Sequence, residues 1–167
     1  IDSLKYWASE FHIDGFRFDL MGILDLETMK TIRQELDKTN PGILLYGEGW
    51  TADHSPMPKH LRAVKSNIAQ LSGIAGFNDD FRDALKGNHG SKKSKGFISG
   101  LDLREEAVKF GIVAATNHPQ IVYDYVETSK RPWSGEPGQC INYFSCHDNY
   151  TLWDKLKMSV PHPVEEQ

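Results

Sequence analysis

The stretch DGFRFDLMG, residues 14–22, combines a short strand-like run with two aspartates and an arginine. Side chains alternate between the two faces of a strand, so Arg17 and Asp19 share one face and the two phenylalanines share the other. Buried charges are costly unless they are paired. Either Arg17 forms a structural ion pair with Asp14 or Asp19, or Asp19 is a functional carboxylate at the strand end, where parallel sheets place their ligands.

A second strand-like run ends in YGEGW, residues 46–50, and places Glu48 between two glycines. Because Gly47 and Gly49 have no side chains, a bulky ligand could approach the carboxylate closely. Trp50 could offer an aromatic face to the apolar side of a sugar ring. The alternative interpretation is a glycine-rich turn that carries a solvated glutamate.

A third run, FSCHDN at residues 144–149, ends in His147, Asp148 and Asn149. Taken alone, Asp148 or Asn149 would be interpreted as the cap of a helix that begins near Thr151. Capping does not explain three successive strand ends that all carry carboxylates. Several carboxylates around one pocket, without a metal-binding motif, favour hydrolysis of a glycosidic bond, in which one carboxylate attacks and another transfers a proton.

The composition restricts the other possibilities. The 167 residues are 39% hydrophobic and carry a formal net charge of −4, which is typical of a globular protein and gives no case for a nucleic-acid partner. No run approaches the roughly 20 apolar residues of a membrane helix. Cys140 and Cys146 lie too far apart along one strand for a disulfide, so we expect free thiols. A zinc site at Cys146 and His147 lacks a second ligand pair, and we expect neither a metal nor a cofactor.

Strand-like runs alternate with helix-like runs, which predicts an α/β fold with a parallel sheet. Ser3 and Asp25 are candidate helix caps, and the glycine-rich stretches 87–100 and 130–139 are expected to be surface loops. The expected helices are 3–12, 26–39, 59–72, 81–87, 101–115 and 151–158, and the expected strands are 15–19, 43–49, 74–78 and 141–146.

The motifs DGFRFDLMG, YGEGW and SCHDN, in this order, resemble three conserved regions of glycoside hydrolase family 13, the α-amylase family. Similarity continues through GFNDDFRDALKGN and NYTLWDKL, so it covers nearly the whole chain. The LMG that follows Asp19, together with Gly49-Trp50, is most similar to the type I pullulanases and glycogen debranching enzymes of the family. Typical α-amylases usually carry a basic residue after the nucleophile.

The resemblance implies a role for each strand-end residue. Asp19 would be the nucleophile of a retaining double displacement, Glu48 the general acid/base and Asp148 the stabiliser of the transition state. The substrate would be an α-glucan, cut at the α-1,6 branch linkages of pullulan, starch or glycogen. The implied contacts to the substrate or the nucleophile are Arg17, His147, Trp50 and Asn149.

The resemblance also implies a (β/α)8 TIM barrel, of which residues 1–167 would form a partial catalytic domain. The chain would run from the third barrel helix to the start of the seventh, with strands four to seven. Strands one to three and eight would be absent, since such a barrel needs eight strands and roughly 250 residues. We expect the remainder of a parent chain to complete the barrel, and the isolated segment to be inactive because its sheet edges are uncovered.

Two alternatives to a debranching hydrolase stay open. One is a related α-glucan enzyme, either an α-1,4-acting amylase or a 4-α-glucanotransferase. The other is a noncatalytic carbohydrate-binding member of the family, although such members generally lose the carboxylates that are present here. Localisation also stays open, since an enzyme on external polysaccharide would be exported and one on stored glycogen would remain inside the cell.

Overall fold

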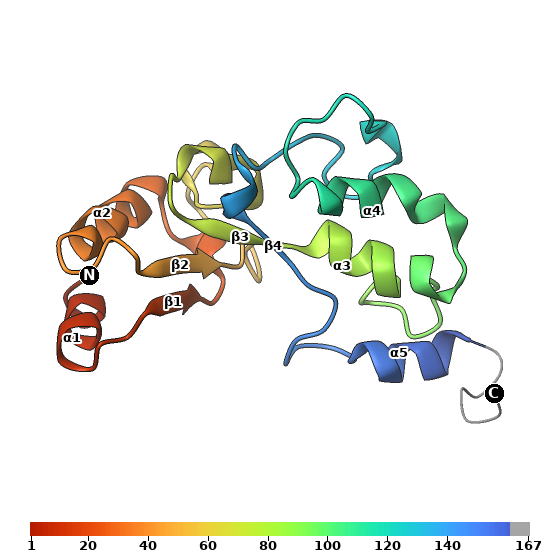
Figure 1. Ribbon diagram of the computed structural model, residues 1–167, viewed down its shortest axis with the longest axis horizontal. Coiled ribbons are helices and arrows are strands. Elements are labelled where there is room, and N and C mark those ends of the chain that lie inside the picture. Colours follow the sequence, from red (N-terminus) through yellow and green to blue (C-terminus); the bar gives the residue numbers. More distant parts are fainter. Residues whose placement is uncertain (161–167) are drawn as a thin grey trace. The chain divides into compact units, whose positions relative to one another are not determined.

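The computed structural model describes residues 1–160, so the last seven residues of the expected 1–167 domain lie outside the described part. The helices and strands follow one another in the order α1-β1-α2-β2-β3-α3-α4-β4-α5, with short 3-10 turns between some of them (Figure 1). The helices are α1 Asp2–Glu10, α2 Leu26–Asp37, α3 Asp79–Lys86, α4 Glu105–Ile112 and α5 Leu152–Ser159, and the strands are β1 Gly15–Phe18, β2 Leu44–Gly47, β3 Ala75–Asn78 and β4 Cys140–Asn142.

The strands form one sheet in the order β1-β2-β3-β4. β1 pairs with β2 in parallel, with Gly15 opposite Leu44 and Phe18 opposite Gly47. β2 pairs with β3 in parallel, and Tyr46 lies opposite Ala75. The predicted α/β fold with a parallel sheet is therefore confirmed, and it brings the ends of β1 and β2 to the same edge of the sheet.

The chain divides into two compact units, which are described separately. The first unit comprises Ile1–Phe77 and Trp133–Ile141, and the second comprises Asn78–Pro132 and Asn142–Gln167. The motifs that contain Asp19 and Glu48 belong to the first unit. The motif that contains Asp148 belongs to the second.

Helix α2 forms much of the core of the first unit. The Asp25 carboxylate accepts the Thr28 N–H at 2.7 Å, which confirms the predicted cap. The predicted apolar face is also confirmed, and its buried members are Leu26, Met29, Ile32 and Leu36. The expected Ser3 cap is wrong, because α1 already begins at Asp2 and Ile1 occupies the cap position.

The helix expected over 59–72 is absent from the described structure, where two short 3-10 turns, Lys59–Leu61 and Lys65–Gln70, take its place. The backbone between them bonds to other segments. The Ala63 N–H donates to Leu24 O at 2.8 Å, and the Lys65 N–H donates to Gly49 O at 2.7 Å. These donors are therefore not available to carbonyls four residues back, and a continuous α-helix cannot form.

The segment 130–139 is not simply a surface loop, because Trp133 and Gln139 are buried in the first unit. The Gln139 side-chain amide donates to Ile68 O at 2.9 Å and to Leu71 O at 2.8 Å. These bonds satisfy two carbonyls at the end of the irregular 59–72 segment. A glutamine in a Pro- and Gly-rich stretch thus anchors that segment, a role that its sequence does not indicate.

In the second unit, Asn78 caps α3 by accepting the Phe81 N–H at 3.2 Å. Its amide also donates to Asn142 Oδ1 at 2.9 Å, and the Asn142 amide donates to Gly111 O at 2.7 Å. The strand expected over 141–146 has shortened to Cys140–Asn142, and the helix expected over 101–115 to Glu105–Ile112. The Asn142 side chain therefore bonds to Asn78, the cap residue of α3, and to α4.

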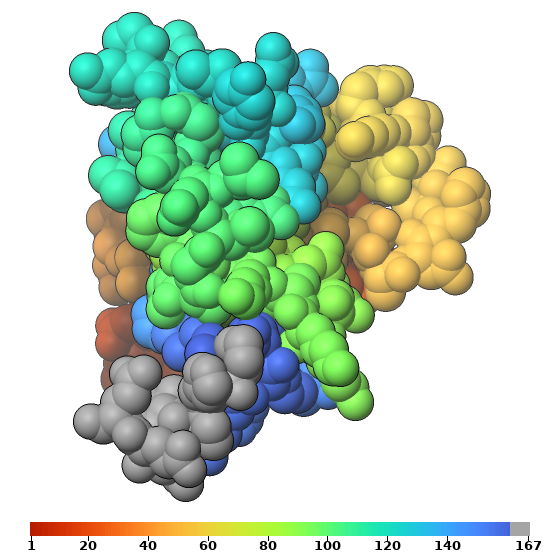
Figure 2. All heavy atoms as spheres, turned by 90° about the vertical axis from the view of Figure 1, so that its right-hand side faces the viewer, coloured from red at the N-terminus to blue at the C-terminus, as the bar shows by residue number. Residues whose placement is uncertain are grey.

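The loop 87–100 packs beside α5 within the second unit (Figure 2, where the loop is yellow-green and α5 blue). The Lys155 ammonium on α5 donates to Asn88 O at 3.0 Å and to Ser94 Oγ at 3.0 Å, and it also donates to Ser91 O. The residue is 1% exposed. A buried lysine therefore holds this loop at three points.

Candidate active site

The candidate site in the first unit is built on the ends of β1 and β2. The parallel register places Phe18 opposite Gly47, and the Glu48 N–H continues the ladder by donating to Phe18 O at 3.1 Å. Asp19 follows the end of β1 and Glu48 follows the end of β2. Two carboxylates that are distant in sequence are thereby brought to one sheet edge.

Arg17 joins these two carboxylates. Its Nη1 donates to Asp19 Oδ1 at 2.5 Å, and its Nη2 donates to Glu48 Oε1 at 2.9 Å. The predicted sharing of one strand face by Arg17 and Asp19 is therefore confirmed. The planar guanidinium suits this geometry because its donors are held in a fixed fork.

The guanidinium is itself held in place. It lies over the Phe77 ring, with its central carbon 5.8 Å from the ring centroid, and Tyr46 packs edge-on against the same ring. Partial burial acts to lower the pKa of Arg17, but the hydrogen bond to Asp19 and the charge of Glu48 outweigh it and raise that pKa above its ordinary value. Arg17 therefore stays cationic between the two carboxylates.

The two carboxylates have different surroundings. The Asp19 side chain is 72% exposed, whereas that of Glu48 is 11% exposed. An exposed carboxylate can approach a substrate atom, and a buried carboxylate with fixed donors is held in one orientation. Pairs of carboxylates in contrasting environments are how acid/base and nucleophilic roles are divided within one site.

The glycines beside Glu48 have a different role from the one expected. A Cβ atom on Gly47 would lie 2.6 Å from Phe18 O, and one on Gly49 would lie 2.8 Å from the Lys65 backbone nitrogen. The space beside both glycines is filled by protein backbone, so the expectation that they admit a ligand is wrong. They allow close packing of the strands and the following loop.

Trp50 is half-buried at the end of the same turn. Its carbonyl accepts the Gly22 N–H at 3.1 Å, and the Glu48 carbonyl accepts the same N–H at 3.1 Å. The turns that follow β1 and β2 are therefore joined through their backbones, immediately beside Asp19 and Glu48. Stacking of the Trp50 ring on a sugar remains a prediction.

The third motif lies in the second unit and is described on its own. His147, Asp148 and Asn149 are exposed, and Asn149 adopts a left-handed backbone with φ 63°. The alternative that Asp148 or Asn149 caps α5 is wrong, because the Thr151 hydroxyl accepts the Asp154 N–H at 3.2 Å in that position. Capping therefore does not account for these side chains, and their roles at the site remain predictions.

Two contacts of the site were not predicted from the sequence. Phe77 supports Arg17 through its ring, and the Leu20 backbone N–H donates to Glu48 Oε2 at 2.7 Å. The presence of two aromatic residues, Tyr46 and Phe77, on neighbouring strands could have indicated the first contact. A backbone donor leaves no trace in residue type, so the second could be found only in the structure.

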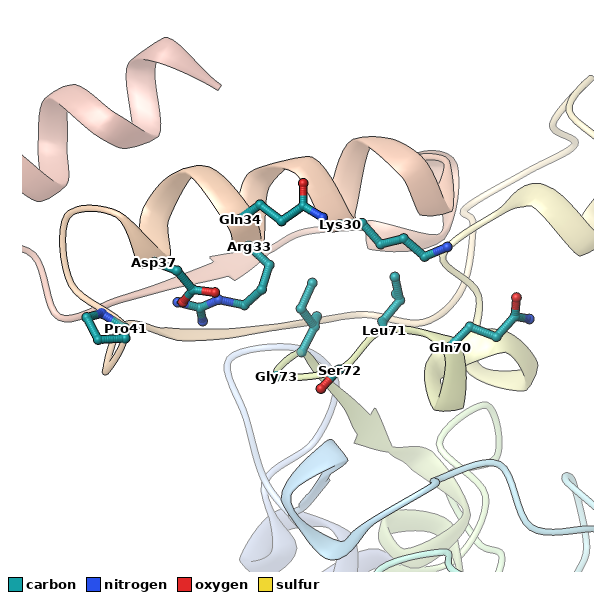
Figure 3. Close-up of a pocket in the computed structure, with 10 residues that line it drawn as sticks. Lys30, Arg33, Gln34, Asp37, Pro41, Gln70, Leu71, Ser72 and Gly73 are labelled. Carbon is teal, nitrogen blue, oxygen red and sulfur yellow. The ribbon is translucent and has the colours of Figure 1, made fainter.

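A separate pocket of about 690 Å³ lies between α2 and the segment 70–74 (Figure 3). None of the candidate site residues lines it. Its cations already have partners, since Arg33 donates to Asp37 Oδ1 and to Ile43 O, both at 2.5 Å, and Lys30 pairs with Glu27 at 2.8 Å. We therefore assign the chemistry to the strand ends and not to this pocket.

Neither Cys140 nor Cys146 forms a disulfide in the structure. Within residues 1–160, no three or more His, Cys, Asp or Glu side chains gather in a way that could hold a metal ion. No helix in that described range has the length and apolar character needed to span a membrane.

Comparison with known proteins shows that the chain is similar to a segment of several pullulanases. It is 41% identical to the pullulanase of Bacillus subtilis (strain 168) over 160 residues, which is 96% of the chain and 21% of that protein. It is 31% identical to chloroplastic pullulanase 1 of Arabidopsis thaliana, with 96% of the chain and 21% of that protein covered. The chain thus spans about a fifth of the length of these curated relatives. No protein-family model matches it.

Solved structures of pullulanases are also similar to this chain. The apo pullulanase of Paenibacillus barengoltzii superposes with a TM-score of 0.86 at 47% identity, over 99% of this chain and 24% of that one. The type I pullulanase of Bacillus subtilis in complex with maltose gives a TM-score of 0.87 at 40% identity, over 99% and 22% of the two chains. The resemblance to debranching enzymes that the three motifs indicate is therefore confirmed along nearly the whole chain.

Proposed function

We propose that this chain, which is similar throughout to one segment of the pullulanases, forms the central part of a glycoside hydrolase that cuts α-1,6-glucosidic branch linkages. The observation that carries the proposal is the Arg17 fork between Asp19 and Glu48. It gives one exposed and one buried carboxylate at adjacent ends of parallel strands, which is the pair of groups that retaining glycoside hydrolysis needs.

The proposed reaction is a double displacement. Asp19 attacks the anomeric carbon while Glu48 gives its proton to the departing glycosidic oxygen, so that a glycosyl ester forms on Asp19 and the bond to the leaving sugar breaks. Glu48, now ionised, then takes a proton from water, and the resulting hydroxide displaces Asp19. The anomeric configuration is inverted twice and therefore retained.

The remaining site residues have supporting roles in this proposal. Asp148 stabilises the positive charge that develops on the sugar ring in the transition state. Arg17 holds Asp19 in position through the hydrogen bond from its Nη1 to Asp19 Oδ1. The proposed substrate contacts are Arg17, His147, Trp50 and Asn149.

We further propose that β1 to β4 are strands four to seven of a (β/α)8 barrel, and that residues 1–167 belong to one catalytic domain. The parallel pairing of β1, β2 and β3 in sequence order supports this assignment. So does the small share of the relatives' length that the chain spans. The rest of the barrel would come from the rest of a parent chain, without which we expect no activity.

The proposed substrate is an α-glucan. One neighbouring structure is a pullulanase in complex with maltohexaose and α-cyclodextrin, and another is a pullulanase complexed with maltotetraose. The products of cleavage show which linkage the enzyme prefers. Cleavage of pullulan to maltotriose indicates α-1,6 hydrolysis, whereas shortening or rearrangement of amylose indicates an amylase or a 4-α-glucanotransferase.

The test uses the full-length enzyme that carries this segment, with Asp19→Asn and Glu48→Gln as the variants. We expect each to lower kcat on pullulan by at least about 1,000-fold, because the first loses the nucleophile and the second the proton donor. Matched controls are Asp14→Asn, just before β1, and Glu27→Gln, an exposed glutamate on α2. Turnover of either site variant close to that of its control would overturn the proposal.

A further inference from the structure

The peptide group that follows the proposed nucleophile is directed at the proposed acid/base. The Leu20 N–H donates to Oε2 of Glu48 at 2.7 Å, and Nη2 of Arg17 donates to Oε1 at 2.9 Å. Each oxygen of this buried carboxylate therefore has its own donor. Rotation of the carboxylate about its last carbon–carbon bond would break both hydrogen bonds.

Leu20 reaches this position through a backbone conformation that leucine rarely adopts. Its φ is 43° and its ψ is 46°, in the left-handed region, where the leucine Cβ is crowded by the backbone. The conformation turns the chain sharply after β1 and directs the N–H toward the residue that follows β2. Residues in such conformations persist only where their surroundings enforce them, and they cluster at functional sites.

The residues after Leu20 enforce the turn. Met21 is completely buried, and the Gly22 N–H is shared between the carbonyls of Glu48 and Trp50, at 3.1 Å each. A Cβ atom on Gly22 would lie only 2.5 Å from the Trp50 carbonyl oxygen, so no other residue fits there without a shift of the backbone. The LMG tail thus fixes the direction of the Leu20 N–H.

We propose that Leu20 is a positioning residue, whose backbone N–H fixes Glu48 for proton transfer to the glycosidic oxygen. This inference rests on the proposed function. A carboxylate offers about four lone-pair sites, so the two donors leave room for the transferred proton and the substrate oxygen. As Glu48 loses its proton it becomes charged, and the Leu20 N–H stabilises that charge without itself losing or gaining a proton.

The decisive variant removes this N–H and leaves every side chain in place. In the full-length enzyme, Leu20 is replaced by its α-hydroxy acid analogue, so that an ester oxygen stands in place of the N–H. The matched control is the same replacement at Leu24, whose N–H donates at 3.0 Å to Met21 O within the same turn and not to Glu48. Both enzymes are assayed on pullulan and on α-maltosyl fluoride, whose fluoride leaves without needing a proton.

We expect the Leu20 ester to lower kcat/KM on pullulan by about 100-fold, because misplacement of a catalytic group costs roughly this much. On α-maltosyl fluoride, kcat/KM should stay within about threefold of the parent, since that leaving group needs no general acid. The Leu24 ester should affect both substrates alike. Equal losses on the two substrates from the Leu20 ester, or no loss on pullulan, would overturn the proposal.

A second measurement does not depend on activity. In enzyme labelled with [15N]leucine, Glu48→Gln should shift the Leu20 amide resonance, because it replaces the carboxylate that accepts this N–H with a carboxamide. Asp19→Asn should leave it in place. If the parent enzyme hydrolyses neither substrate, the proposed function fails, while the Leu20 shift still shows whether the hydrogen bond exists. If the parent enzyme is active but Glu48→Gln leaves the Leu20 resonance unchanged, the positioning role alone is overturned.

Discussion

Nη2 of Arg17 donates a 2.9 Å hydrogen bond to Oε1 of Glu48, and so joins the residues at the ends of two neighbouring parallel strands. The same guanidinium holds Asp19 through its other terminal nitrogen. One planar group therefore sets the orientation of both carboxylates. Its function depends on the fork geometry as well as on the charge.

We accordingly expect Arg17→Lys to be strongly impaired although it conserves the charge. A lysine ammonium is a single point donor and cannot hold two carboxylates in a fixed fork, so kcat on pullulan should fall by about 100-fold. The measurement is steady-state kinetics on the full-length enzyme. Arg33→Lys is the control, because Arg33 also donates to two partners but lies on α2 beside the separate pocket. Activity of Arg17→Lys equal to that of the control would show that charge alone suffices.

Gly22 provides a test of stability. A methyl group at this position would overlap the Trp50 carbonyl oxygen, only 2.5 Å away, and would push apart the turns after β1 and β2. We expect Gly22→Ala to lower the free energy of unfolding by about 1–3 kcal/mol, the usual cost of overpacking. Thermal unfolding of the full-length enzyme measures the effect as a lower melting temperature.

Gly138→Ala is the matched control for this substitution, because nothing lies within 4 Å of its Cβ position. That change should leave the melting temperature unchanged or raise it slightly, since alanine restricts the unfolded chain more than glycine does. An equal decrease for both variants would contradict the assigned role of Gly22.

The buried Lys155 should control access to the loop 87–100. Its ammonium donates to three oxygens of that loop, and burial lowers the pKa of Lys155 below its ordinary value. Lys155→Met removes all three bonds from α5, so that Asn88 O and Ser91 O keep only hydrogen bonds from within the loop. We expect tryptic cleavage after the loop lysines at 92, 93 and 95 to accelerate by at least about tenfold.

Mass spectrometry of timed tryptic digests measures this cleavage. Lys157→Met on the same helix is the control, because Lys157 is exposed and its ammonium lies 4.9 Å from the Trp153 ring centroid. Cleavage of the loop at the same rate in both variants would mean that Lys155 does not hold it.

The sequence pattern predicted the parts of the fold that depend on local periodicity. The amphipathic spacing of α2, its Asp25 cap and the alternation within β1 all have local causes, and the structure confirms them. The prediction of a helix over 59–72 was wrong because backbone donors of this segment bond to Leu24 and Gly49, which are distant in sequence. Periodicity cannot report such long-range hydrogen bonds.

The site was predictable in its side chains and not in its backbone. Asp19 and Glu48 stand out because carboxylates at strand ends need a reason, and the structure brings them to one guanidinium. Met21 and Gly22 appeared to reflect substrate preference alone, whereas their burial and close contacts show that they hold the Leu20 turn. That role depends on a left-handed φ, which a leucine in the sequence does not indicate.

Tyr143 of the second unit should lose its hydroxyl proton at a higher pH than an ordinary tyrosine. Burial raises the pKa of Tyr143 to about 12 from the ordinary 10.0, although Arg82, which donates to its hydroxyl at 2.8 Å, opposes the shift. The unfolded chain therefore loses this proton at lower pH than the folded chain, so the stability from Tyr143 is complete below pH 10.0 and is lost as the pH rises toward 12. Absorbance at 295 nm, compared between the parent and Tyr143→Phe, isolates this one tyrosinate. Its appearance near pH 10.0, while circular dichroism still reports a folded enzyme, would contradict the burial of this hydroxyl.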